Sequence, residues 1–412
     1  MKDMDLDVYR FSIAWSRVLP NGALSGGVNQ EGINYYNNLI NELISNGIQP
    51  LVTLFHWDLP QMLEDQYQGF LGSKIIDDFR DYADLCFSKF GDRVKLWATL
   101  NEPLVYIMGY SNGVFAPGRC SDRSKCTTGD SSTEPYIVGH NLIRAHGCAA
   151  KLYKEKYQIT QKGQIGLTLN TIWMVPYSDS NEDKIAAARE MNFQFGWFMN
   201  PLYNGSYPTD MLVNVGKRLP KFTEEESKMV KGSYDFISVN YYTARYAAAI
   251  PCPTQNLDYN TDDCVNVTQE RNGIPIGPAE KGSWINFYPK GLEDYLVYIK
   301  EKYNDPILYV TENGVFDPNV MKDVLNDQSR IQFIQSHLIH IQNAIRAGAK
   351  VKGYMMWTFL DDFEWSGGYG DRPGMVHVDF NNGFKRTLKQ SALWYKTFLT
   401  SAKFMNTKDE DL

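Results

Sequence analysis

Short hydrophobic runs recur along the chain, and each leads into polar residues. The runs are rich in β-branched and aromatic residues, which is typical of strands, and longer stretches with helical spacing of hydrophobic residues lie between them. Two of these stretches, 33–47 and 329–348, close with a glycine, the residue favoured just after a helix. The pattern predicts strands in seven runs, at 9–15, 49–57, 94–102, 164–170, 236–242, 307–313 and 351–365.

Strands that alternate with helices predict parallel pairing and a sheet that is buried on both faces. A doubly wound sheet would carry a glycine-rich phosphate turn after a strand, and none of the runs is followed by GxGxxG or GxxxxGK[ST]. We therefore expect an α/β fold of the (β/α) barrel type, in which catalytic groups gather at the carboxyl ends of the strands. The polar residues at these ends are His56, Asn101, Glu102, Asn240, Tyr242, Glu312 and Glu364.

The chain carries no low-complexity tract, Pro/Ser-rich linker or long run of charge. One barrel domain over residues 1–412 is therefore favoured. The stretch 244–288 is rich in Pro, Gly and Asn, and it is predicted to be a surface loop over one end of the barrel.

Composition narrows the classes of partner. Of the 412 residues, 43% are hydrophobic and 22% charged, and the formal net charge is -7. Lysines and arginines are scattered, so no nucleic-acid or membrane-surface partner is indicated, and no apolar stretch is long enough to span a bilayer. The 9 Trp and 26 Tyr residues suit stacking on sugar rings, although core packing accounts for most of them.

Cys120 and Cys126 lie close together in a polar loop, and we expect a disulfide between them. Their spacing does not fit a zinc knuckle or a redox pair, and the other four cysteines lie in apolar or isolated contexts. Asn204 and Asn266 begin glycosylation sequons, which with the disulfide favours a secretory origin. The first residues of the chain do not form a signal peptide.

Two strand ends place a glutamate in an apolar setting, TLNEP with Glu102 and VTENG with Glu312. Either one alone could equally be a structural ion pair below a loop. Two at matching ends of one barrel suit glycoside cleavage, which needs a carboxyl pair at roughly 5 to 5.5 Å for retention or 6.5 to 9.5 Å for inversion of configuration. The sequence alone leaves this choice open.

The ordered motifs YRFSIAWSR, LFHWDLP, TLNEP, VNYYT, VTENG and WTFLDDFEW resemble those of family 1 glycoside hydrolases. SWINFYPKG and FEWSGGYGDRPGMVHVDF add similarity to the plant β-glucosidase branch, and the similarity extends to about residue 396. The resemblance implies an eight-stranded (β/α)8 TIM barrel and a hydrolase without a cofactor or metal. Its substrate would be a small-molecule β-glycoside, cleaved with retention through a covalent glycosyl-enzyme, with Glu102 as acid/base and Glu312 as nucleophile.

The resemblance also assigns the residues around this pair. Arg10 would stabilise the ionised nucleophile and Tyr242 would donate a hydrogen bond to it, although both could also be core residues. His56 has no second ligand at metal-binding spacing, so it is predicted to contact sugar instead. The expected substrate-binding residues are His56, Asn101, Asn240 and Glu364, with Trp357 and Trp365 as sugar platforms and Trp284 on the side of the leaving group.

Two positions narrow the range of expected substrates. S-glycoside hydrolases of the family replace the acid/base with Gln, whereas this chain keeps Glu102, and phospho-sugar hydrolases replace the equivalent of Glu364. An unphosphorylated O-glycoside of glucose, fucose, galactose or a disaccharide is therefore expected. The small size of Val105, Gly109, Ala116 and Ser366 predicts a wide entrance for the leaving group.

The family's first barrel strand, with its sugar-binding Gln, has no counterpart here, and the chain starts inside the helix before the second strand. Seven strands would leave a gap with two unpaired edges, so we expect this chain by itself to be unstable or weakly active. The alternatives are a catalytically impaired sugar-binding or regulatory isoform, and a transglycosidase that uses the same two carboxylates. A homo-oligomer is possible, and a full-length relative is expected in the vacuole or outside the cell.

Overall fold

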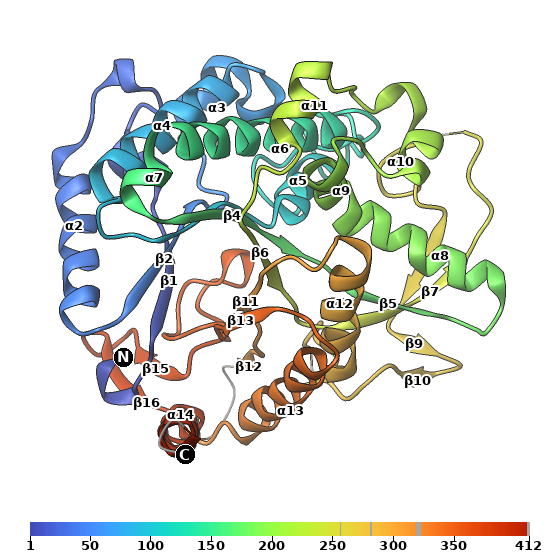
Figure 1. Ribbon diagram of the computed structural model, residues 1–412. Coiled ribbons are helices and arrows are strands. Elements are labelled where there is room, and N and C mark those ends of the chain that lie inside the picture. The colour runs from blue at the N-terminus through green and yellow to red at the C-terminus, as the bar shows by residue number, and fades with distance from the viewer. Residues whose placement is uncertain (256, 281, 319–322, 410–412) are drawn as a thin grey trace.

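A parallel sheet of seven strands forms the centre of the protein in a computed structural model, which describes residues 1–255, 257–280, 282–318 and 323–409. The strands follow chain order across the sheet, and the sheet curls as in a (β/α) barrel (Figure 1). Each of the seven predicted runs contains one of them, to within one residue at the start of β1, so the predicted fold class is confirmed. In order they are β1 Val8–Ser12, β2 Gln49–Phe55, β3 Leu96–Asn101, β4 Gln164–Asn170, β6 Phe236–Asn240, β11 Leu308–Glu312 and β13 Val351–Tyr354.

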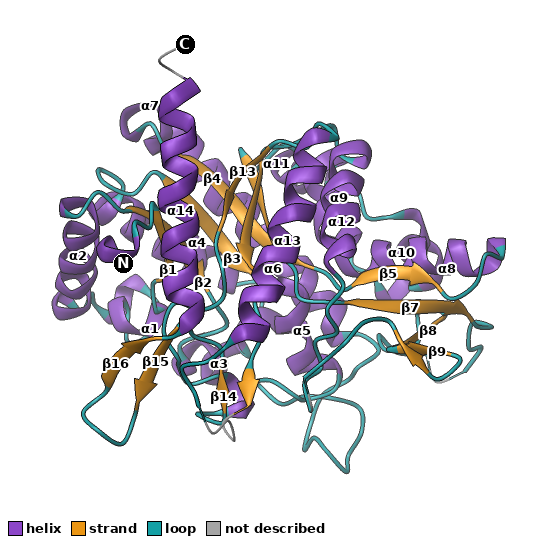
Figure 2. Ribbon diagram, turned by 90° about the horizontal axis from the view of Figure 1, so that it is seen from below, coloured by secondary structure: helices purple, strands orange, loops and turns teal. Residues whose placement is uncertain are grey.

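Helices surround this sheet (Figures 1 and 2). The predicted glycine stops are confirmed at Gly47 and Gly348, because both adopt the positive φ that glycine tolerates just past α2 and α13. The helices are α1 Trp15–Val18, α2 Gln30–Ser45, α3 Gln61–Tyr67, α4 Ile75–Phe90, α5 Pro103–Ser111, α6 Glu134–Leu152, α7 Gln158–Gln161, α8 Asn181–Met191, α9 Trp197–Asn204, α10 Thr209–Asn214, α11 Glu224–Val230, α12 Pro289–Lys302, α13 Gln328–Arg346 and α14 Gln390–Asp409. None of these helices is long and apolar enough to cross a membrane.

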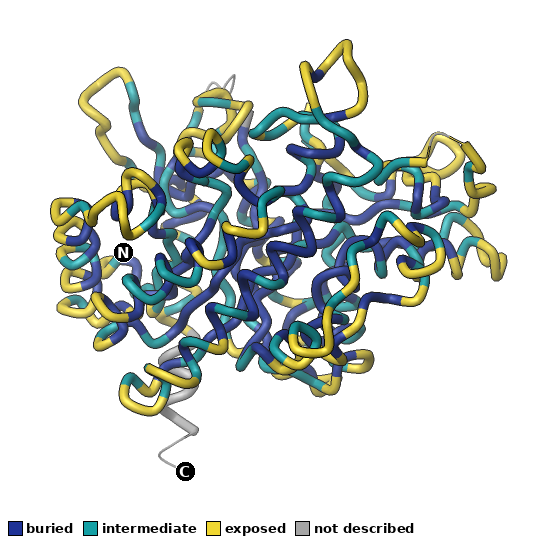
Figure 3. Tube along the Cα trace, turned by 90° about the horizontal axis from the view of Figure 1, so that it is seen from above, coloured by how far each residue is buried: buried dark blue, intermediate teal, exposed yellow. Residues whose placement is uncertain are grey.

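The inner strands of the sheet are almost completely buried, whereas the two outer ones are not. Every residue of β3 and β6 is buried, but all five of β1 are only half-buried. Figure 3 shows that buried segments fill the middle of the molecule and exposed ones lie at its surface. Within the described ranges β1 pairs only with β2, and β13 only with β11. A cavity of about 740 Å³ is lined by residues of both outer strands, so the two open edges expected for a seven-stranded sheet are present.

The stretch 244–288 is not simply a surface loop, as the sequence had suggested. It contributes β7 Ala244–Ala249 and β8 Val265–Thr268, which join β5 Trp173–Pro176 in a small sheet beside α8 (Figure 1). Ala244, Arg245 and Ala247 are buried and Ala249 is exposed, so this strand is covered on both faces at its start and exposed at its end. Three short pairs complete the fold: β9 Glu270–Arg271 with β10 Ile274–Pro275, β12 Asp317–Pro318 with β14 Asp371–Arg372, and β15 Val376–Asp379 with β16 Lys385–Leu388.

Two disulfides stabilise loops beside the sheet. Cys120–Cys126 is formed as predicted. Cys252–Cys264 was missed, because a chain reversal within a stretch read as irregular brings the two Cα atoms to 4.8 Å. Asn204 and Asn266 are both exposed, as a sugar acceptor must be, and their glycosylation stays a prediction.

Candidate active site

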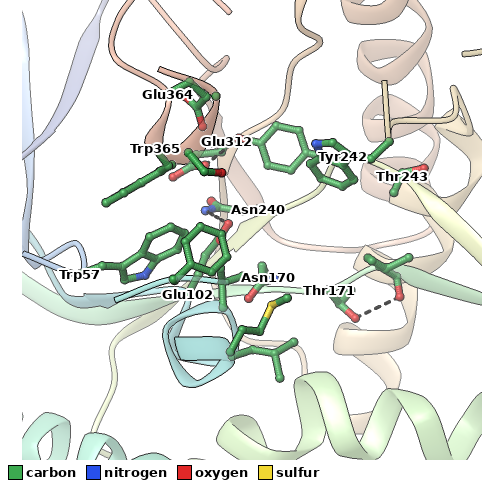
Figure 4. A pocket seen from close by; sticks show the side chains of 18 of the residues that line it. Trp57, Glu102, Asn170, Thr171, Asn240, Tyr242, Thr243, Glu312, Glu364 and Trp365 are labelled. Atoms are coloured by element: carbon green, nitrogen blue, oxygen red, sulfur yellow. Dashed lines mark hydrogen bonds between the residues drawn. The ribbon is translucent and has the colours of Figure 1, made fainter. Parts of the chain in front are cut away.

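The carboxyl ends of the strands open into a cavity of about 740 Å³. Every residue predicted from the strand ends lies on its wall, as do the three predicted tryptophans; Arg10 is not on the wall but contacts it through Glu312. Figure 4 shows Glu102, Glu312 and Asn240 grouped in the middle of this cavity. The predicted residues on the wall are His56, Asn101, Glu102, Asn240, Tyr242, Trp284, Glu312, Trp357, Glu364 and Trp365.

Glu312, the last residue of β11, has two strong partners. Arg10 donates from Nη1 to Oε1 at 2.7 Å, and Tyr242 donates its hydroxyl to Oε2 at 2.7 Å. Both contacts are buried, because the side chains of Arg10 and Glu312 are only 5% and 6% exposed. Charge-assisted hydrogen bonds of this kind hold the carboxylate in a fixed orientation, which a nucleophile requires.

Glu102 follows β3 in a left-handed conformation, with φ 43°, at the start of α5. Asn240 donates from Nδ2 to Oε1 of Glu102 at 2.7 Å. The Thr311 hydroxyl in turn donates to the side-chain Oδ1 of Asn240 at 2.8 Å. Burial, and then the negative charge of Glu312, raise the pKa of Glu102 to about 8. At neutral pH this carboxyl is therefore a proton donor.

Asn101 connects these groups to His56. Its Oδ1 accepts from Arg10 Nη2 at 2.6 Å, and its Nδ2 lies 3.1 Å from His56 Nε2. Burial and then the Arg10 charge lower the pKa of His56 to about 3. The imidazole is thus neutral, and because Nε2 accepts from Asn101, its proton lies on Nδ1.

Aromatic rings form the other part of the wall. The rings of Trp357 and Trp365 both stack on the His56 imidazole, with ring centroids 6.0 and 5.9 Å from it. Trp57, which was not predicted, lies 4.6 Å from Trp365. Trp284 stands at the rim, 46% exposed and 5.7 Å from the Tyr242 ring. Flat apolar faces beside polar groups suit the two kinds of surface that a sugar ring presents.

Glu364 lies on a loop after β13 that an ion-pair network holds in place. Lys389, 1% exposed, donates to Asp361 at 3.1 Å, and Asp361 also accepts from the backbone N–H groups of Gly374 and Val378. Burial, and then the charges of Asp362 and Glu312, raise the pKa of Glu364 to about 8.

Several residues of the cavity wall were not predicted from the sequence. Asn170 could have been found, because it ends the fourth strand run as Asn101 nearly ends the third. Glu190 and Gln194 come from α8 and from the π-helical turn after it, where no strand-end rule applies. Gly109 does not widen the entrance as expected; a Cβ there would lie 2.3 Å from the Ala116 carbonyl oxygen, so close packing explains the glycine.

Comparison with known proteins identifies the class of this site. The model of glycosyl hydrolase family 1 matches residues 1–404. The chain belongs to glycosyl hydrolase family 1. It is 56% identical to β-glucosidase 16 of Arabidopsis thaliana over 98% of this chain and 79% of that protein. It is 53% identical to the furostanol glycoside 26-O-β-glucosidase of Hellenia speciosa, over 97% of this chain and 72% of that protein.

Solved structures of family 1 agree with this assignment. Rice Os3BGlu6 β-glucosidase superposes with a TM-score of 0.94 at 44% identity, covering 96% of this chain and 85% of that one, and a mutant of it was solved in a covalent complex with glucose. A β-glucosidase of the fungus Humicola insolens, solved with glucose, gives a TM-score of 0.94 at 39% identity, with 97% and 85% covered. The predicted class, a retaining β-glycoside hydrolase, is confirmed by this membership.

Proposed function

We propose that Glu312 is the nucleophile and Glu102 the acid/base in hydrolysis of an unphosphorylated β-glucoside. The observation that carries the proposal is the contrast between two carboxyl groups in one cavity. Glu312 is paired with a cation and a phenol, whereas Glu102 has an amide partner and a raised pKa. Two titratable groups whose environments separate their protonation states are typical of an acid and a nucleophile.

In the first step an oxygen of Glu312 attacks the anomeric carbon, and the bond from that carbon to the leaving oxygen breaks. Glu102 gives its proton to that oxygen, so the alcohol departs neutral. Arg10 and Tyr242 hold Glu312 throughout by their hydrogen bonds. The products of this step are a glycosyl ester on Glu312 and an ionised Glu102.

The second step reverses the role of Glu102. Because the negative charge of Glu312 is one cause of the raised pKa of Glu102, forming the ester lowers that pKa. Glu102 can then take a proton from water while the water oxygen attacks the anomeric carbon and Glu312 is released. Two inversions give net retention.

Glucose is the proposed sugar because β-glucosidases are prominent among the relatives and two similar structures hold glucose. His56, Asn101, Glu364 and the tryptophans supply the donors, acceptors and flat face for it. The non-catalytic alternative has no support from the contacts described, since both carboxyl groups keep partners suited to the reaction.

The nucleophile can be tested by incubation with a 2-deoxy-2-fluoro-β-glucoside that carries a good leaving group. We expect one covalent glycosyl group per chain, located on Glu312 by peptide mass spectrometry. Glu312→Gln should take up no label and lose turnover, whereas Glu225→Gln, an exposed change on α11, should behave as wild type. A label on any other carboxylate would refute the assignment.

We propose three further properties of the protein. Residues 1–412 act as one barrel domain, the protein enters the secretory pathway, and it can form a homo-oligomer. The exposed sequons at Asn204 and Asn266 and the two disulfides support the second. Glycan mass on the protein isolated from its source, and light scattering in solution, would test the second and third.

A further inference from the structure

Thr311 is buried directly behind the active-site cavity without forming part of its wall. It precedes Glu312 on β11 and is only 1% exposed. In the pairing of β11 with β6, Val310 lies opposite Val239. Glu312 lies opposite Asn240, so Thr311 is an extra residue between the two pairs. A bulge of this kind re-aims a side chain, and the Thr311 hydroxyl donates to Oδ1 of Asn240 at 2.8 Å.

The orientation of the Asn240 amide follows from its contacts. Arg10 can only donate, and its Nη2 lies 2.6 Å from the Asn101 amide atom that must therefore be the oxygen. Asn240 approaches the same oxygen at 3.2 Å, so it presents its Nδ2 there. Nδ2 also donates to Oε1 of Glu102 at 2.7 Å, and both of its hydrogens are then in use. The amide oxygen is left to face Thr311.

This amide determines which oxygen of Glu102 carries the acid proton. Oε1 accepts from Asn240, and the carbonyl oxygen of a carboxylic acid is its better acceptor, so the proton lies on Oε2. Among the residues that the structure describes, none forms a hydrogen bond with Oε2, and Glu102 lies on the wall of the cavity. The acid proton is therefore free to pass to a ligand.

The Thr311 hydroxyl is the one hydrogen-bond partner of Asn240 Oδ1 within the described part of the chain. Without it, a buried carbonyl oxygen would lack a donor, which is costly. The amide can reduce this cost by rotating toward another donor, and any such rotation draws Nδ2 away from Glu102.

We propose that Thr311 is a positioning residue for the acid/base, which through Asn240 keeps the proton of Glu102 on the oxygen that faces the cavity. The inference rests on the proposed function and identifies a residue that prepares its acid. Thr311 does not touch the substrate, so its effect is confined to the steps in which Glu102 gives or takes a proton.

The test compares two glucosides that share the transferred sugar. Phenyl β-glucoside needs a proton on its leaving oxygen, whereas dinitrophenyl β-glucoside departs without one. Thr311→Val, which removes the hydroxyl and keeps the branched shape, should lower kcat/KM for phenyl glucoside by about 10-fold and for the dinitrophenyl substrate by less than about 3-fold. Thr311→Ser, which keeps the hydroxyl, should restore most of the loss. Thr160→Val, an exposed change on α7, should behave as wild type.

Two further measurements distinguish positioning from a purely structural role. Burial raises the pKa of Glu102, and the hydrogen bond from Asn240 lowers it. Weakening that bond in Thr311→Val should therefore move the alkaline limb of kcat/KM for phenyl glucoside to higher pH. Asn240→Ala should show the same selective loss, and adding Thr311→Val to it should increase that selectivity no further, since Thr311 acts through Asn240.

The outcomes separate this inference from the proposed function. An equal loss on both substrates, no loss on either, or additive selective losses in the double variant would overturn the inference. Should Thr311→Val fail to fold, Thr311→Ala, which also lacks the hydroxyl, decides the question by the same comparison. The proposed function itself would be wrong if Glu102→Gln kept the wild-type kcat/KM on phenyl glucoside.

Discussion

In the proposed mechanism, single residues around Glu102 and Glu312 decide which carboxyl group gives a proton and which attacks. The strand-end rule and the family resemblance located both glutamates in the sequence, together with Arg10 and Tyr242. The hydrogen bond from Asn240 to Glu102 could not be predicted, because it depends on how Thr311 orients an amide on a neighbouring strand. The identity of these residues was thus predictable from the sequence, whereas their hydrogen-bond partners could be identified only from the structure.

The raised pKa of Glu102 predicts the alkaline limit of activity. The acid form is competent in the free enzyme, so kcat/KM should fall as pH rises through about 8. A pH profile with a glucoside of poor leaving ability measures this. In Glu102→Gln, assayed with a leaving group that needs no proton, the alkaline limb should vanish. If it persists at the same pH, another group is responsible.

We expect Tyr242 to contribute to turnover only through its hydroxyl group. Tyr242→Phe removes the donor to Glu312 Oε2, and a hydrogen bond to a charged group is worth about 1.5 to 3 kcal/mol. We expect kcat/KM to fall by about 10- to 100-fold, with an unchanged circular dichroism spectrum. Tyr35→Phe, at a half-exposed surface position, is the matched control. An unaffected rate would show that Arg10 suffices.

At the scale of elements, local patterns predicted most of the architecture. The seven hydrophobic runs and the glycines after α2 and α13 were read correctly, because burial on both faces and a positive φ leave direct marks on a sequence. The small sheet of β5, β7 and β8 was missed, since its strands are separated by long stretches of chain. The Cys252–Cys264 pairing was missed because the chain reversal that brings the two cysteines together lies in a stretch read as irregular.

The second disulfide should hold one wall of the cavity. It closes a loop whose cysteines are 12 residues apart, and that loop carries Tyr259 and Asn260 to the leaving-group side. For Cys252→Ser/Cys264→Ser we expect a Tm lower by several degrees, since a loop of this size is worth about 3 kcal/mol, and faster protease cleavage within it. Cys148→Ser, at a half-buried free cysteine, is the control. Unchanged cleavage would mean that Arg189 and Arg218 hold the loop alone.

The whole molecule is a curled sheet whose edge strands, β1 and β13, differ from its centre. The barrel class was predictable from alternation, and the seven-strand count followed from the number of runs. The shape of the cavity between the edge strands could not be predicted from the sequence, because it depends on how α14 and the loop after β13 lie against these strands.

The rate of backbone amide hydrogen exchange should differ between the edge strands and the central strands of the sheet. Amides of β1 that point away from β2 have no strand partner among the described residues, whereas β3 pairs on both sides. In hydrogen–deuterium exchange we expect peptides covering residues 8–12 to exchange faster than those covering 96–101. Equal protection of the two would show that the edges are covered in solution.

The left-handed backbone conformation of Glu102 has a consequence for the evolution of proteins with this site. A non-glycine residue at φ 43° costs about 1 kcal/mol, and its buried carboxyl adds a further penalty as pH rises from its unfolded pKa through about 8. Glu102→Gly removes both costs along with the acid/base, so the inactive variant should melt at a higher temperature at neutral pH. A duplicated gene in which this glutamate is replaced would therefore still encode a stable protein. Such a protein can evolve to bind sugars without cleaving them.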